Sequence, residues 1–215
     1  MSNAVLEAPV RTPVVAPAAP RHVTVSDYLA IDTAAARRSE FIEEKIIEMA
    51  GASRDHVRIV TNIVSQLAAQ TADRDCDVFS NDTRVRADSY YYPDVGVVCG
   101  NYLVDNRQID TLTNPTVLIE VLSRSTQQVD QGIKRRNYLR LPSLRTYLLV
   151  SQDFPAVEQY ERIEDGEWRF IETEGLDATV MLPAIDCQLP LIAIYRRVAV
   201  GDLAERDADA PNDVR

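Results

Sequence analysis

The segment NPTVLIEVLS, residues 114–123, is an apolar run interrupted by one carboxylate, Glu120. Short apolar runs bounded by turn-forming residues are typical of buried strands. A second run of this kind, DVGVVC at residues 94–99, starts with Asp94 directly after a proline. We therefore predict strands at residues 116–122 and 94–99, each with one carboxylate in an apolar setting.

Further helices and strands are predicted on both sides of these two strands. Apolar side chains recur at helical spacing from Ser53 to about Gln70, and a third helix from about Gln127 to Leu141 would end before Pro142. A first, short helix would carry Tyr28. The other predicted strands are residues 45–49, 78–79, 83–86, 147–150, 156–162 and 168–172, the last two as a hairpin around Asp165-Gly166. This order predicts an α/β (α+β) fold, a mixed β-sheet flanked by helices.

The chain length predicts one domain with two tails. With 215 residues and 46% hydrophobic content, the chain can form one sizeable core, which we place at residues 23–200. Residues 1–22 are rich in proline and alanine and are predicted to be a disordered arm, and residues 201–215 an acidic flexible tail. Without a membrane-length apolar run or a signal pattern, we expect a soluble, cytoplasmic protein with no membrane partner.

The three cysteines give no sign of a shared role. Cys76, Cys99 and Cys187 are widely spaced and form no CxxC pair. We therefore expect buried, reduced thiols, and neither a disulfide framework nor a zinc site is suggested.

The net charge of −10 at first argues against a nucleic-acid partner. Residues 153–177 hold nine acidic and two basic side chains and residues 202–215 hold five and two, contributing −7 and −3, so the rest sums to zero. Inside that neutral remainder lies a local basic cluster: Lys134, Arg135, Arg136, Arg140 and Arg145. The charge distribution therefore leaves room for contacts with phosphate.

Asp94 and Glu120 are candidate ligands of a divalent metal ion. Ionised side chains are rarely buried without a partner, so both carboxylates require a cation or hydrogen bonds. If their strands are adjacent, the two side chains and the Val121 carbonyl supply hard oxygen ligands suited to Mg²⁺ or Mn²⁺, which could activate water against a phosphodiester. The alternative is that Asp94 lies in a turn after Pro93 and Glu120 pairs with an arginine.

Three further side chains are candidates for the same site. Lys134 shares one helix face with Asp130 and Tyr138, so it could stabilise developing phosphate charge, or it could form only a surface ion pair with Asp130. Glu40 and His56 are secondary candidates as proton acceptors, metal ligands or water-positioning groups. A lone histidine at a helix start is more often a local hydrogen-bonding group.

These segments together resemble the Uma-two family of restriction endonuclease-like proteins, within the PD-(D/E)XK nuclease superfamily. The motifs that carry the resemblance cover most of residues 24–195. They are SEFIEEKIIEMAGAS (39–53), His56, YYPDVGVVC (91–99), NPTVLIEVLSRST (114–126), D-x3-K-x3-Y (130–138) and LPSLRTYLLVSQD (141–153).

The resemblance implies a nuclease-like core in which Asp94 and Glu120 bind a divalent metal and a lysine assists. In the wider superfamily that lysine stands two residues after the glutamate, where this chain has Leu122. The family pattern implies that Lys134 supplies the amine instead, and that Glu40 and His56 occupy motif positions.

Our first functional hypothesis is a Mg²⁺- or Mn²⁺-dependent DNA endonuclease. Its Arg135, Arg136 and Arg140 would contact the nucleic-acid backbone, and a homodimer would place two such sites on a duplex. The second is a catalytically weak or inactive nuclease-fold binding module, which the acidic total charge favours. A third, a serine hydrolase, would need a base beside Ser123 or Ser125, and no G-x-S-x-G elbow surrounds them.

Overall fold

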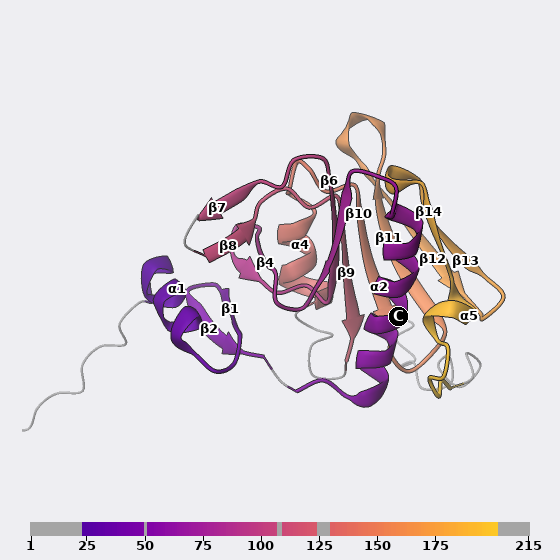
Figure 1. Ribbon diagram of the computed structural model, residues 1–215, viewed down its shortest axis with the longest axis horizontal. Helices are drawn as coiled ribbons and strands as arrows, with labels where there is room; N and C mark the ends of the chain where they lie inside the picture. The colour runs from indigo at the N-terminus through magenta and orange to yellow at the C-terminus, as the bar shows by residue number, and fades with distance from the viewer. Residues whose placement is uncertain (1–22, 50, 107–108, 124–129, 202–215) are drawn as a thin grey trace, which may run out of the picture.

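A computed structural model describes residues 23–49, 51–106, 109–123 and 130–201 of the chain (Figure 1). The arm predicted at residues 1–22 and residues 202–215 of the predicted tail lie outside this part. Among the described helices, none is both long and apolar enough to cross a membrane.

A six-stranded sheet, here called the central sheet, has the order β12-β11-β10-β9-β6-β3. Strands β9 and β10 are parallel, and the other neighbours are antiparallel, so the sheet is mixed as predicted. The strands are β3 (Cys76–Ser80), β6 (Val95–Cys99), β9 (Val117–Leu122), β10 (Thr146–Ser151), β11 (Ala156–Arg162) and β12 (Trp168–Glu174).

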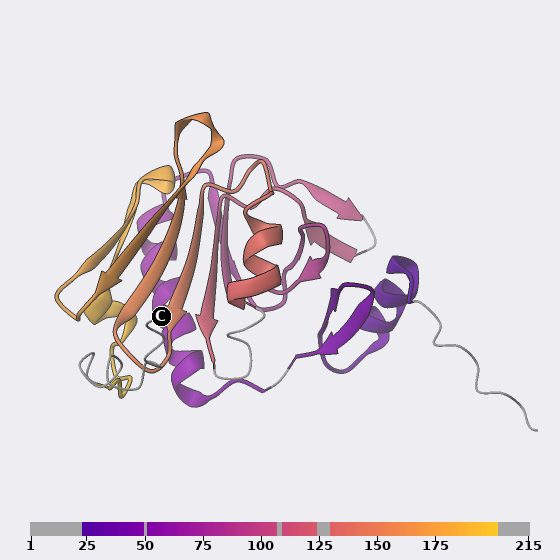
Figure 2. The same cartoon turned by 180° about the vertical axis from the view of Figure 1, so that it is seen from behind.

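Helices cover both faces of the central sheet, as Figures 1 and 2 show from opposite sides. Helix α2 (Arg54–Thr71) packs on one face together with α5 (Leu191–Ile194) and the hairpin of β13 (Thr179–Leu182) and β14 (Cys187–Pro190). The other face carries the π-helical turn η1 (Asp130–Lys134), which continues into α4 (Arg135–Tyr138).

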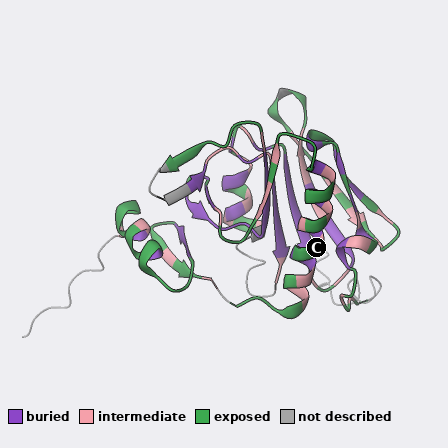
Figure 3. Cartoon of the chain, viewed as in Figure 1, coloured by how far each residue is buried: buried purple, intermediate pink, exposed green. Residues whose placement is uncertain are grey.

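Strand β9 shows how the sequence produces this two-sided burial. Val117, Ile119 and Val121 join the core beneath α2, whereas Leu118 joins the core beneath α4. Alternate residues of a strand point to opposite faces, so Glu120 faces the same side as Leu118. Figure 3 shows the middle strands of the central sheet buried and the outer side of α2 exposed.

A second six-stranded sheet, with the order β2-β1-β5-β4-β8-β7, connects the N-terminal segment to the rest of the molecule. Helix α1 (Val25–Ala34) and the hairpin of β1 (Ser39–Ile42) and β2 (Lys45–Glu48), here called the N-terminal hairpin, lie at its end (Figure 1). Its other strands are β4 (Arg84–Arg86), β5 (Tyr90–Tyr91), β7 (Val104–Asn106) and β8 (Ile109–Leu112).

A buried polar network fixes this N-terminal segment. The Asp32 carboxylate accepts hydrogen bonds from the Ser39 amide at 2.8 Å, the Arg84 guanidinium at 3.3 Å and the Tyr92 hydroxyl. Asp32 is fully buried and Arg84 is 2% exposed. A charge that is removed from water at this depth needs such partners, so the network determines how α1 meets the second sheet.

Several predicted elements are confirmed, and others are corrected. The helix predicted from Ser53 runs from Arg54 to Thr71, with the Ser53 side chain as its cap. The helix predicted from Gln127 is described only from Asp130 and begins as a π-helical turn, and residues 124–129 lie outside the described part. The sequence placed the first strand at residues 45–49, after Glu40, but the structure has an earlier strand, β1, which contains Glu40 and pairs antiparallel with β2.

The prediction of three reduced thiols was wrong for two of them. Cys76 and Cys99 stand opposite each other in the ladder between β3 and β6 and form a disulfide. Their separation of 23 residues carries no signal because the pairing depends on strand register. Cys187 is free and buried, and burial raises the pKa of its thiol.

Replacing Asp32 tests the buried network. Asp32→Ala would leave the Arg84 charge without its carboxylate, and we expect a loss of about 3–5 kcal/mol in the free energy of unfolding. Asp73→Ala, at an exposed position, should change it by less than about 0.5 kcal/mol. Equal stability of the two variants in urea titrations would contradict a structural role for Asp32.

Candidate functional site

The candidate site residues line a cavity of about 920 Å³ between the central sheet and the N-terminal hairpin. It contains all five side chains singled out from the sequence, namely Glu40, His56, Asp94, Glu120 and Lys134, together with Val121. Its other lining residues are Arg37, Arg38, Ile47, Glu48, Met49, Gly51, Ala52, Ser53, Asn81, Asp82, Tyr92, Ser123, Gln152 and Asp153.

Asp94 and Glu120 are brought together by the pairing of β6 with β9. The antiparallel register begins with Val95 opposite Ile119, so Asp94, in the bend directly before β6, and Glu120, directly after Ile119, stand at the same end of this ladder. The Asp94 Oδ2 atom also accepts a hydrogen bond from the Val121 amide at 2.7 Å, which fixes this carboxylate beside the end of β9.

Lys134 reaches this point from the helix on the same face of the sheet. Its Nζ atom lies 2.9 Å from Glu40 Oε1 and 3.4 Å from Glu120 Oε1. The three side chains are at most 8% exposed, so water screens their charges little. The ammonium therefore bridges a carboxylate of the N-terminal hairpin and a carboxylate of the central sheet.

His56 holds Asp94 from the opposite side of the sheet. It lies in the first turn of α2, and its Nε2 atom is 3.0 Å from Asp94 Oδ1. The Ser53 cap also accepts a hydrogen bond from the His56 amide, which fixes the start of the helix. His56 is thus a partner of Asp94 and not only a local helix-capping group.

Tyr138 positions Glu120 from one helical turn beyond Lys134. Its hydroxyl donates a hydrogen bond of 3.2 Å to Glu120 Oε1. Burial raises the pKa of Tyr138 well above its ordinary value, and the nearby charges of Glu120 and Glu40 act in the same direction. The hydroxyl therefore stays protonated and remains a donor.

The three arginines predicted to contact nucleic acid lie outside the cavity lining. Arg135 donates a hydrogen bond of 2.6 Å to the Tyr160 hydroxyl and stacks on that ring. Arg136 and Arg140 are exposed and pair with Glu43 at 4.0 Å and Asp88 at 3.3 Å. The structure therefore does not bring these arginines into the cavity that contains Asp94 and Glu120.

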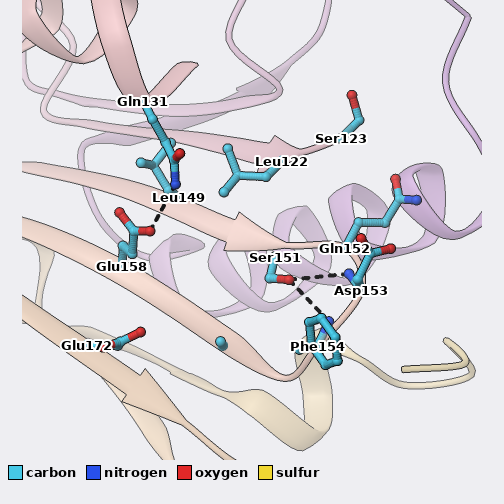
Figure 4. Close-up of a pocket in the computed structure, with 11 residues that line it drawn as sticks. Leu122, Ser123, Gln131, Leu149, Ser151, Gln152, Asp153, Phe154, Glu158 and Glu172 are labelled. Carbon is cyan, nitrogen blue, oxygen red and sulfur yellow. Dashed lines mark hydrogen bonds between the residues drawn. The ribbon is translucent and has the colours of Figure 1, made fainter. Parts of the chain in front are cut away.

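A second, smaller cavity of about 180 Å³ adjoins the first and shares Ser123, Gln152 and Asp153 with it. Figure 4 shows that Gln131 bonds to Glu158 and that the Ser151 hydroxyl accepts from two backbone amides. His56, the histidine within the described part of the chain, directs its Nε2 atom at Asp94. Ser125 lies outside the described residues. The serine-hydrolase hypothesis gains no support from this geometry.

The oxygen atoms of Asp94, Glu120 and Val121 suit a hard divalent cation that binds few protein ligands. Within the described ranges, no group of three or more His, Cys, Asp or Glu side chains is placed to hold a metal ion. Mg²⁺ keeps several waters and commonly uses only one or two carboxylates, so Asp94 and Glu120 could hold it without a third side chain. The N–H and C=O of one strand residue point to the same neighbour, so the Val121 carbonyl faces the side where its amide meets Asp94.

Two functional features escaped sequence reasoning. Tyr92 donates its amide to Glu40 Oε1 at 3.1 Å and its hydroxyl to Asp32, so it joins the site to the buried network. Arg37 and Arg38 line the cavity next to β1. Neither had a pattern of its own, although both arginines directly precede the quoted SEFIEEK motif.

Lys134→Met tests the bridging role. It would leave two buried carboxylates without their shared cation, and we expect the free energy of unfolding to fall by about 3–5 kcal/mol. The matched control is Lys45→Met, which replaces the other lysine of the chain at an exposed position and should leave stability nearly unchanged. Lys134→Arg should retain more stability than Lys134→Met in urea titrations, and a neutral Lys134→Met would refute the bridge.

Comparisons with known proteins identify a family and a shared fold. A family model described as "Uma2: Putative restriction endonuclease" matches residues 25–192. Two uncharacterized proteins of Synechocystis sp. (strain ATCC 27184 / PCC 6803 / Kazusa) are 36% and 28% identical, covering 74% and 80% of this chain and 91% of each relative. The crystal structure of "a putative nuclease belonging to DUF820" from Anabaena variabilis ATCC 29413 superposes with a TM-score of 0.66 and 21% identity, covering 80% of this chain and 97% of that one. This last likeness shows a shared fold.

Proposed function

Since the chain belongs to the Uma2 family, we propose that it is a divalent-metal-dependent DNA endonuclease that hydrolyses phosphodiester bonds. The observation that carries the proposal is the contact of Lys134 Nζ with Glu120 Oε1, beside Asp94, whose Oδ2 atom accepts the amide of the next residue, Val121. Two neighbouring carboxylates can hold a metal and a buried amine can stabilise developing negative charge, and a metal-assisted phosphodiester hydrolase can use both.

In this proposal Asp94 and Glu120, with the Val121 carbonyl, hold Mg²⁺ or Mn²⁺. The metal, when bound, would polarise the phosphodiester and lower the pKa of a water. The protein groups around it fix the two carboxylates: His56 holds Asp94, and Tyr138 holds Glu120.

Lys134 has a separate task in the same proposal. Its ammonium would donate hydrogen bonds to a non-bridging phosphate oxygen as negative charge develops there. Glu40 keeps the amine in place at 2.9 Å, and the Tyr92 amide in turn orients Glu40 at 3.1 Å. In this proposal Lys134 stands in for the lysine that is missing at position 122, and its contact with Glu120 from the neighbouring helix supports that role.

The second candidate is a nuclease-fold module that binds without cutting. A Lys134 directed at solvent would favour it, but this side chain is 6% exposed and directed at Glu120. The acidic cavity lining remains its best support, since carboxylates repel a phosphate backbone. We retain duplex DNA as the proposed partner and a homodimer as the proposed assembly, because two related sites can cut both strands.

Metal titration separates the two functions. We expect calorimetry to detect Mg²⁺ or Mn²⁺ binding to the wild type and to Asp77→Ala, an exposed control outside the cavity, but not to Asp94→Ala or Glu120→Ala. Supercoiled plasmid should be nicked only by the two proteins that bind metal. Metal binding without nicking would favour the binding module, and no binding at all would refute the catalytic proposal.

Lys134→Met should separate metal binding from cleavage. Loss of the amine removes a donor to the developing charge, and we expect cleavage to fall by about 10²-fold to 10³-fold. Mg²⁺ binding should be equal or tighter, because the variant removes a competing cation from Glu120. Calorimetry and plasmid nicking on a sample shown to be folded by circular dichroism check this. Cleavage at the wild-type rate would exclude Lys134 from the chemistry.

A further inference from the structure

The cavity that holds the candidate site is strongly acidic. Its lining includes six carboxylates but only three lysine or arginine side chains, Lys134, Arg37 and Arg38. The carboxylates are Glu40, Glu48, Asp82, Asp94, Glu120 and Asp153. Lys134 is already paired with Glu40 and Glu120 at the base of the site. A polyanionic substrate therefore needs further positive charge on the cavity wall.

Arg38 is held at that wall by an anchored aromatic ring. Its guanidinium carbon lies 5.8 Å from the centre of the Tyr92 ring. Tyr92 is fixed at two points, through its amide to Glu40 and through its hydroxyl to Asp32. The Arg38 carbonyl accepts the Met49 amide at 3.1 Å, so its backbone belongs to the N-terminal hairpin. The guanidinium therefore lines the same cavity as Asp94 and Glu120 and pairs with Asp82.

The carboxylates that now pair with the two arginines are weak competitors. Arg38 contacts Asp82 at 3.3 Å and Arg37 contacts Glu48 at 3.9 Å, and the two acidic side chains are 82% and 68% exposed. Ion pairs this exposed are screened by water and contribute little. A phosphate diester accepts two parallel hydrogen bonds from one guanidinium, so it can replace such a partner.

From these contacts we propose that Arg37 and Arg38 bind the phosphodiester backbone of the substrate on the cavity wall formed by the N-terminal hairpin. This inference rests on the proposed nuclease function and specifies where its substrate lies. Asp82 and Glu48 hold the two guanidiniums before the substrate arrives. Arg37 and Arg38 are then positioning residues, in place of the helix arginines Arg136 and Arg140, which lie outside the cavity lining.

The test measures binding of a fluorescein-labelled DNA duplex with phosphorothioate linkages, which resist cleavage, by anisotropy in Mg²⁺ over a range of salt concentrations. Arg37→Ala and Arg38→Ala should each weaken binding about fivefold and flatten the log–log salt slope by about one. Asp82→Asn should act in the opposite direction and tighten binding at least about twofold, since it removes the competing carboxylate. Arg169→Ala, at an exposed arginine outside the cavity, is the matched control and should bind as the wild type does.

The outcomes separate this inference from the proposed function. If the wild type binds and nicks DNA but Arg37→Ala and Arg38→Ala keep its affinity and salt slope, the inference falls and the function stands. Loss of the slope in Arg136→Ala or Arg140→Ala alone would place the DNA on the helix and also overturn it. Weaker DNA binding by Asp82→Asn would show that Asp82 supports Arg38 and does not compete with the substrate, and it would overturn the inference. A wild type that neither binds nor nicks DNA overturns both proposals.

Discussion

The contact of one buried ammonium with two buried carboxylates joins the parts of this protein. Lys134 belongs to the helix on the central sheet, Glu120 to the middle of β9, and Glu40 to the N-terminal hairpin. Each charge would be unfavourable at this depth alone, and each is tolerated because the other two are present. The position of the hairpin relative to the sheet is therefore coupled to the electrostatics of the site.

The same constraint explains why the supporting polar groups gather here. Tyr92 donates to Glu40 and also to Asp32, the centre of the network below α1. Tyr138 and His56 complete the hydrogen bonding of Glu120 and Asp94. A set of carboxylates held by separate donors keeps its geometry without a bound cation. This organisation is suited to a site that must be shaped before its ligands arrive.

Local patterns predicted the parts of the fold that local physics determines. The apolar spacing predicted α2 to within one residue at each end, and the run around Glu120 predicted β9. The short strand β1 was missed because all four of its residues are buried in the second sheet. Its sequence therefore lacks the alternation of apolar and polar residues that would indicate a strand. The Cys76–Cys99 pair was missed because register across two strands cannot be read from spacing. Motif resemblance, and not spacing, placed Lys134 near Glu120, and only the assembled structure placed Arg37 and Arg38 on the cavity wall.

The order in which the site residues Glu40, Asp94, Glu120 and Lys134 occur along the chain has a consequence for synthesis of the protein. Glu40 emerges first, Asp94 and Glu120 follow, and Lys134 comes last, before β10 to β12 complete the sheet that buries them. A ribosome-bound fragment that ends before Lys134 holds every carboxylate of the cluster but not the amine that neutralises them. Mutual repulsion would disfavour closing of the hairpin onto the sheet in such a fragment. The cluster therefore forms late in translation, when most of the domain has been made.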